Sequence, residues 1–143
     1  MKHQADLQRV VDFFESISPE TSHSLSDIYT DDVWFKDPFN EVHGIAPVRH
    51  IFTHMFDQLD APRFVVTHSI LQEEHAFLTW DFLFRMKRFS NDEQCIRGAT
   101  HIRFSGDGRV NYHRDYWDAA EELYEKLPVV GALMRWLKTR AKN

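Results

Sequence analysis

The sequence has little of what marks membrane, nucleic-acid-binding or disulfide-stabilised proteins. Its single cysteine, Cys95, cannot form a disulfide within the chain, so we expect a reducing, cytoplasmic location. No apolar run approaches the ~20 residues of a membrane span, and no charged-then-apolar leader predicts a signal peptide. The formal net charge of −5 argues against a nucleic-acid partner, because such a surface needs a basic face.

Repeats, low-complexity segments and linkers are also absent. The 143 residues suit one domain with one core, over residues 1–143. Hydrophobic residues make up 43% and charged residues 27%, an ordinary balance for a soluble protein. Aromatic residues are plentiful at 14%, and 12 of them are phenylalanines. Rings bury much area per residue, so a small domain can use them to line a cavity.

The first half of the chain predicts helices around one strand. Residues 6–17 and 45–59 carry apolar side chains at helical spacing, and a short helix is expected through Leu25 and Ile28. Residues 31–39 alternate as a strand does, with Asp37 on the same face as Phe35. Pro38 ends this strand or marks a sheet edge.

The second half predicts four strands, over residues 63–71, 75–89, 93–104 and 109–118. The segments QEE, SND and SGDG separate them as hairpin turns, which indicates an antiparallel meander. A helix over 119–126 and a basic amphipathic helix follow. Helices first and a curled sheet after them is an α+β pattern, in which the helices cover one face of the sheet.

The order and spacing of several stretches resemble the nuclear transport factor 2-like superfamily, and its SnoaL-like and ketosteroid isomerase-like domains in particular. The stretches are LSDIYTDDVWFKDPF, GIAPVRHIFTHMF, THIRFSGDGRV and HRDYWD. The resemblance implies a cone: a curved antiparallel sheet wrapped around N-terminal helices, with a C-terminal helix. It also implies an apolar pocket at one end, predicted at roughly 300–1,000 Å³.

The resemblance to ketosteroid isomerase implies a general base at Asp37, in the step Asp37-Pro38. The oxyanion-hole tyrosine of that enzyme is matched by Phe13, and its protonated aspartate is matched by Thr100. The base is kept here and both oxyanion donors are changed. An oxyanion hole often supplies the largest catalytic effect, so this chain is not expected to isomerise steroids in that way.

The last predicted strand resembles that of limonene epoxide hydrolase, whose catalytic trio is two aspartates bridged by an arginine. The resemblance implies Asp115 in HRDYWD as one aspartate and Asp81 in TWDF as the other. Thr79 stands where the arginine is expected, so the two carboxylates lack that bridging cation.

Strand alternation places His113, Asp115 and Trp117 on one face and Tyr112 on the other. The resemblance turns the first set inward. Residues 77–86 leave two possibilities. The family register turns Asp81 inward and exposes three bulky rings, which a homodimer through the sheet face would cover. Otherwise those rings, at positions 80, 82 and 84, form the core face and Asp81 is solvated.

Metal binding is not expected. His50 and His54 have the i,i+4 spacing of metal ligands, but they lie opposite the apolar stripe of their helix and point to solvent.

We therefore expect a pocket enzyme without metal or organic cofactor, an isomerase, cyclase or hydrolase that works on a small apolar, ring-sized molecule by carboxylate acid–base chemistry. Asp37 is the expected base, Asp115 its partner acid or orienter, and His113 the neighbour of Asp115. Asp81 and Tyr112 are weaker candidates. The remaining expected substrate contacts are Phe13, Phe35, Phe52, Thr100 and Trp117. A ligand-binding module without chemistry and a dimeric interaction domain are the alternatives.

Overall fold

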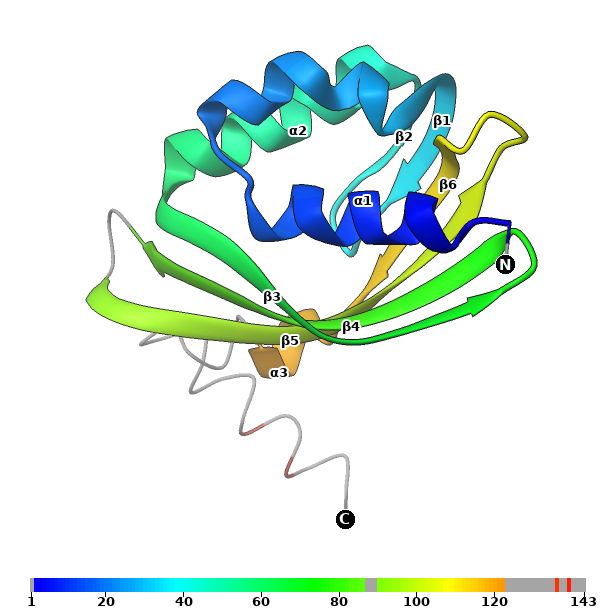
Figure 1. Ribbon diagram of the computed structural model, residues 1–143. Coiled ribbons are helices and arrows are strands. Elements are labelled where there is room, and N and C mark those ends of the chain that lie inside the picture. The colour runs from blue at the N-terminus through cyan, green and yellow to red at the C-terminus, as the bar shows by residue number, and fades with distance from the viewer. Residues whose placement is uncertain (1, 87–89, 123–135, 137–138, 140–143) are drawn as a thin grey trace.

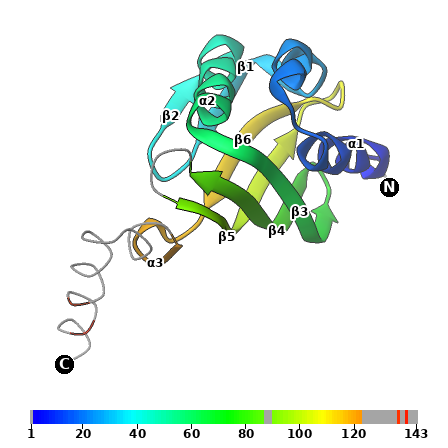
Figure 2. The same cartoon turned by 90° about the vertical axis from the view of Figure 1, so that its left-hand side faces the viewer.

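A computed structural model of the chain describes residues 2–86, 90–122, 136 and 139. Three helical segments lie on the inner face of a curved sheet, which is the α+β arrangement that the sequence predicts (Figures 1 and 2). They are α1 (Gln4–Glu15), the 3₁₀ helix η1 (Pro19–Asp27) and α2 (Ile45–Gln58).

The two α-helices are held by one apolar stripe each. Helix α1 buries Leu7, Val10, Phe13 and Phe14, which recur at helical spacing and face the sheet. Helix α2 buries Val48 and Phe52 in the same way. Between them, η1 begins with a capping box in which Ser18 and Thr21 exchange hydrogen bonds.

The sheet has six strands in the order β2-β1-β6-β5-β4-β3. Strands β3 to β6 form the predicted antiparallel meander, whereas β1 pairs with β6 in parallel. The strands are β1 (Tyr29–Lys36), β2 (Glu41–His43), β3 (Leu59–Gln72), β4 (His75–Met86), β5 (Ser90–Phe104) and β6 (Val110–Tyr116). Because β6 lies at the centre, its side chains face the helices from the middle of the sheet.

Three details differ from the prediction. Strand β2 was not predicted, since its three residues are too few to show alternation. Strand β3 begins at Leu59 and contains Pro62, where its register with β4 shifts between Asp60 and Arg63. A bulge of this kind tolerates proline within a strand. The predicted turn SND is also wrong, because Ser90 already pairs with Met86 in the sheet.

Strand β4 shows which sheet face is the core. Trp80, Phe82 and Phe84 are at most 8% exposed, while Phe77 between two buried neighbours is 50% exposed. The bulky set therefore packs under the helices, and the outer face carries the alternate residues. Of the two arrangements that the sequence left open, the one with the rings inside and Asp81 on the outer face is found, because it buries three large rings and leaves the carboxylate near water.

After β6 the chain turns onto the outer side of the sheet, where helix α3 (Ala119–Glu122) lies (Figure 1). Arg97 of β5 ties this helix to the sheet by donating from Nε to Glu122 Oε1 at 2.9 Å. The predicted basic C-terminal helix lies outside the described residues. No helix in the described part of the chain is long and apolar enough to cross a membrane.

Candidate functional site

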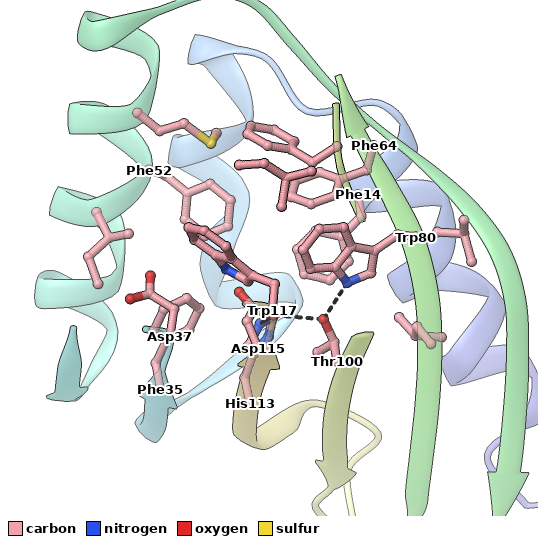
Figure 3. Close-up of a pocket in the computed structure, with 16 residues that line it drawn as sticks. Phe14, Phe35, Asp37, Phe52, Phe64, Trp80, Thr100, His113, Asp115 and Trp117 are labelled. Carbon is pink, nitrogen blue, oxygen red and sulfur yellow. Dashed lines mark hydrogen bonds and ion pairs between the residues drawn. The ribbon is translucent and has the colours of Figure 1, made fainter. Parts of the chain in front are cut away.

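A cavity of about 140 Å³ lies between the helices and the inner face of the sheet. Its apolar wall comes from α1, α2 and strands β1 and β3 to β5 (Figure 3). The apolar residues are Phe14, Phe35, Ile51, Phe52, Met55, Phe64, Val66, Leu78, Trp80, Phe82, Ile96 and Trp117. Four polar side chains complete the lining: Asp37, Thr100, His113 and Asp115.

The cavity is smaller than predicted, because aromatic rings from several elements fill the inside of the cone. Phe64 of β3 packs against Phe14, Trp80 and Phe82, with ring centroids 4.6 to 5.6 Å apart. A cavity of about 150 Å³ lined by apolar side chains holds benzene. The remaining space therefore suits one ring.

A chain of hydrogen bonds crosses the sheet at one end of this cavity. His113 Nε2 lies 2.7 Å from Asp115 Oδ1, and the Thr100 hydroxyl donates to the same oxygen at 2.6 Å. Trp80 Nε1 donates to Thr100 Oγ1 at 2.7 Å. At the far end, the Tyr29 hydroxyl lies 3.0 Å from His113 Nδ1. Five side chains from four strands, Asp115 among them, thus form one chain of hydrogen bonds, in which His113 and Thr100 contact the carboxylate directly.

The directions of these bonds follow from donor and acceptor chemistry. The Asp115 carboxylate only accepts, so the Nε2 atom of His113 donates to it; the Tyr29 hydroxyl completes the chain at Nδ1. The Trp80 N–H only donates, so Thr100 Oγ1 accepts from it. The Thr100 hydroxyl in turn donates its hydrogen bond to Asp115. Both Thr100 and His113 donate their hydrogen bonds to Oδ1. Among the residues that the structure describes, none donates to Oδ2, which leaves this oxygen for a ligand.

Tyr29 is the buried end of the chain of hydrogen bonds. It is 0% exposed, and burial, followed by the nearby negative charge of Asp115, raises the pKa of its hydroxyl well above 10. Tyr29 therefore stays protonated and holds the His113 ring, which is itself stacked on Phe35 with centroids 4.5 Å apart. The imidazole has one fixed orientation relative to Asp115.

Asp37 lines the same cavity but is engaged in its own turn. Its Oδ1 accepts from the backbone amides of Phe39 (2.8 Å) and Asn40 (2.7 Å) and from the Asn40 side chain. These bonds shape the Asp-Pro turn after β1. Among the described residues, Oδ2 accepts from Asn40 Nδ2 alone, at 3.2 Å. Asp37 thus stabilises its turn through Oδ1, while its Oδ2 can still accept a hydrogen bond from a ligand.

A second hollow, of about 560 Å³, adjoins the cavity and shares Asp37, Asp115 and Trp117 with it. We call it the vestibule. Its other lining residues are Lys36, Pro38, Arg114, Tyr116 and Asp118. The two aspartates therefore lie where the apolar cavity meets the vestibule.

The other predicted site residues divide into two groups. Phe35, Phe52, Thr100 and Trp117 line the cavity. Asp81, Phe13 and Tyr112 do not: Asp81 is on the outer face opposite Val65 and Arg97, and Tyr112 stacks on Trp34 there. Phe13 is buried on α1 against Phe14 and Phe52.

Sequence reasoning missed Tyr29 and Trp80 as members of the site. Tyr29 stands at the first position of β1, and its partner His113 is 84 residues away. No spacing in the sequence indicates such a contact. Trp80 would have been found by assigning the bulky face of residues 77–86 to the core.

No metal centre is present within the described segments: no three histidine, cysteine, aspartate or glutamate side chains there come close enough to share an ion. His50 and His54 are exposed on α2, as their position opposite the apolar stripe predicts.

Residues 10–113 match the model of the SnoaL-like domain family, so this chain belongs to that family. The sequence matches none of the curated proteins.

Solved structures of the same fold are distant in sequence. A proposed SnoaL-like polyketide cyclase from Jannaschia sp. CCS1 is 12% identical, with a TM-score of 0.71, over 84% of this chain and 88% of that one. An epoxide hydrolase of M. tuberculosis, similar to limonene epoxide hydrolase, is 10% identical, with a TM-score of 0.69, over 96% and 92%. A ketosteroid isomerase-like protein of Catenulispora acidiphila DSM 44928, in complex with trimethylamine, is 12% identical, with a TM-score of 0.71, over 84% and 90%. These likenesses establish the fold.

Proposed function

We propose that this chain is a cytoplasmic, single-domain enzyme of the isomerase, cyclase or hydrolase type, which acts on a one-ring apolar molecule by acid–base chemistry. The observation that carries the proposal is the Asp115 carboxylate, which lines an apolar cavity of one-ring size: His113 and Thr100 hold one of its oxygens, and no described residue donates to the other.

Asp115 fits the role of base better than Asp37 does. Its orientation is fixed by two side chains that are both at most 3% exposed, so Oδ2 is already positioned before a ligand arrives. Oδ2 would take a proton from carbon in an isomerase or cyclase, or from water in a hydrolase. The Asp37 oxygens, in contrast, already serve the turn. We assign Asp37 to the binding of the substrate at the mouth of the cavity.

The experiment uses two one-ring probes, cyclohexanone and cyclohexene oxide. Deuterium exchange into cyclohexanone, followed by NMR, reports a base acting on carbon, and hydrolysis of cyclohexene oxide reports a base acting on water. We expect one of the two rates to exceed that in buffer, and Asp115→Asn to abolish the excess with an unchanged melting temperature. Asp81→Asn, the same substitution on the outer face, should leave the rate above that in buffer unchanged.

A binding module without chemistry is the second candidate. The observation that favours it is the loss of both oxyanion donors, since Phe13 has no hydroxyl and the Thr100 hydroxyl is occupied by Asp115. The two candidates separate cleanly: a chain that binds cyclohexanone in the cavity, yet accelerates neither probe reaction, is a binding module. A chain that binds neither probe has neither function.

We also propose that two copies of the chain pair through the outer face of the sheet. Trp80, Phe82 and Phe84 of β4 do not support this pairing, because they are buried inside the chain. The support comes instead from Val65, Ile70, Phe77 and Tyr116, which are 42% to 67% exposed on β3, β4 and β6. Such a group on one sheet face is typical of an interaction surface.

A further inference from the structure

The wall of the cavity has two carboxylates and one imidazole, that of His113, which donates to Asp115 Oδ1. Asp37 and Asp115 are its only side chains of formal charge, and no lysine or arginine in the described part of the chain lines it. The rest of the wall is apolar apart from Thr100 and His113. Two like charges that line the same apolar cavity repel each other, more strongly the less water reaches them.

Both carboxylates retain an oxygen that can still accept a hydrogen bond. Oδ2 of Asp115 receives no donor from the described residues, and Oδ2 of Asp37 receives only the 3.2 Å bond from Asn40. A ligand that offers N–H donors and a positive charge would use both oxygens and remove the repulsion.

The rings of the wall suit the same kind of ligand. Seven of the lining residues are phenylalanine or tryptophan, and Trp117 lies at the boundary with the vestibule, beside the two acids. The faces of such rings attract cations, most strongly when the site is shielded from water. They also hold the apolar part of the ligand.

We propose that the natural ligand of this cavity is a one-ring primary amine, bound as the ammonium ion at the end lined by Asp37 and Asp115. This inference rests on the proposed function: the ligand keeps the apolar ring proposed there and gains one charged group. The ring occupies the space of about 140 Å³, and the amine faces the vestibule. A molecule with the dimensions of benzylamine fits, since benzene fills a cavity of about 150 Å³.

The cations of the vestibule do not change this preference. Lys36 Nζ is paired with Glu41 Oε2 at 3.3 Å, and the Arg114 guanidinium lies 4.5 Å from the centroid of the Tyr116 ring. Asp118, on the same rim, adds a further negative charge. An anionic ligand would therefore be repelled by Asp37 and Asp115, while Lys36 and Arg114 are already engaged with Glu41 and Tyr116.

The experiment compares three probes of one shape and different charge: benzylamine, benzyl alcohol and benzoate. Their affinities for the full chain are measured by calorimetry at pH 7, where an alkylamine is protonated. We expect benzylamine to bind at least about tenfold more tightly than benzyl alcohol, the ratio that one charge-assisted hydrogen bond supplies. Benzoate should bind more weakly than either.

The variants identify the charges responsible. Asp37→Asn keeps an acceptor for the turn and should lower benzylamine affinity about tenfold, with benzyl alcohol affinity unchanged within twofold. Asp115→Asn should also lower benzylamine affinity. Asp81→Asn removes the same charge from the outer face and should alter neither affinity.

The outcomes separate the inference from the proposed function. If benzyl alcohol or benzoate binds in the cavity as tightly as benzylamine does, the amine inference is overturned while the small-molecule pocket stands. If benzylamine binding survives both Asp37→Asn and Asp115→Asn, the inference is overturned as well. If none of the three probes binds, the proposed pocket function fails together with the inference.

Discussion

Thr100 and Asp115 lie opposite each other on strands β5 and β6, and the threonine hydroxyl donates to Asp115 Oδ1 at 2.6 Å. Because this hydroxyl also accepts from Trp80, it links the largest ring of the cavity wall to the carboxylate. The position that resembles an oxyanion donor of ketosteroid isomerase thus serves here to orient an acid. Packing and chemistry depend on the same side chain.

Replacing the Thr100 hydroxyl should weaken both the packing of Trp80 and the orientation of Asp115. Thr100→Val has nearly the same shape and leaves the buried Trp80 N–H without its partner. We expect a loss of about 1–3 kcal/mol in the free energy of unfolding, measured by urea denaturation, and a shift in tryptophan fluorescence. Thr79→Val, on the exposed face of β4, should change the unfolding free energy by no more than about 0.5 kcal/mol. Equal effects of the two substitutions would contradict the role of Thr100.

Gly98 faces Trp80 across the β4–β5 pairing, and a Cβ atom at this position would lie 2.4 Å from the indole ring. Gly98→Ala should displace the ring, destabilise the fold by about 1–3 kcal/mol and weaken the binding of benzyl alcohol. The matched control is Gly106→Ala, because nothing lies within 4 Å of its added Cβ atom. A Gly98→Ala protein with normal stability and binding would show that Trp80 is free to move aside.

Tyr29→Phe should remove a fully buried hydroxyl and leave His113 Nδ1 without its partner. We expect a loss of about 1–2 kcal/mol in the free energy of unfolding at pH 7. Tyr116→Phe removes a hydroxyl from the exposed outer face and should have a much smaller effect. Similar losses in the two variants would mean that the bond to His113 contributes little.

The same tyrosine predicts a loss of stability in alkali. Burial and the charge of Asp115 raise the Tyr29 pKa above its usual value, so the unfolded chain releases this proton near pH ~10 and the folded chain keeps it. The contribution of Tyr29 is complete below pH ~10 and is lost as the pH rises further, by about 1.4 kcal/mol per pH unit. Urea denaturation between pH 8 and 11 should show a shallower decline in Tyr29→Phe; parallel curves would contradict the assignment.

The proposed dimer depends on the exposed outer face. Phe77→Asp introduces a charge directly opposite Ile70 on the outer face, and should convert a dimer to a monomer in sedimentation equilibrium. Asp57→Arg, on the exposed side of α2, should leave the mass unchanged. If the unmodified chain is already monomeric at micromolar concentration, pairing through this face is wrong.

The sequence predicted most of the fold because helical and alternating segments are easily told apart, and the turns between the later strands are short. Alternation grouped His113, Asp115 and Trp117 on one face, and the family resemblance turned that face inward, where all three line the cavity. The sequence was not sufficient for Asp81. There the family register and the burial of rings pointed in opposite directions, and the apolar area of Trp80 and its neighbours decided the outcome.

Other parts of the site depend on distances that no local pattern encodes. The bond from Tyr29 to His113 spans 84 positions and exists because β1 lies beside β6 in parallel. The size of the cavity depends on how rings from α1, β3 and β4 pack together, which composition alone does not fix. Asp37 was recognisable by its Asp-Pro step, but only the structure shows how completely the turn uses its Oδ1.

The vestibule, at about 560 Å³, is four times larger than the cavity that it adjoins. The selection of ligands by size therefore applies only to the part of a molecule that passes Trp117. A substituent that stays in the vestibule meets a much larger space, of about 560 Å³, and is less restricted in length. Chemical libraries for this protein should accordingly fix a small ring as the common head group and vary the tail, because two molecules of very different mass can present the same buried portion.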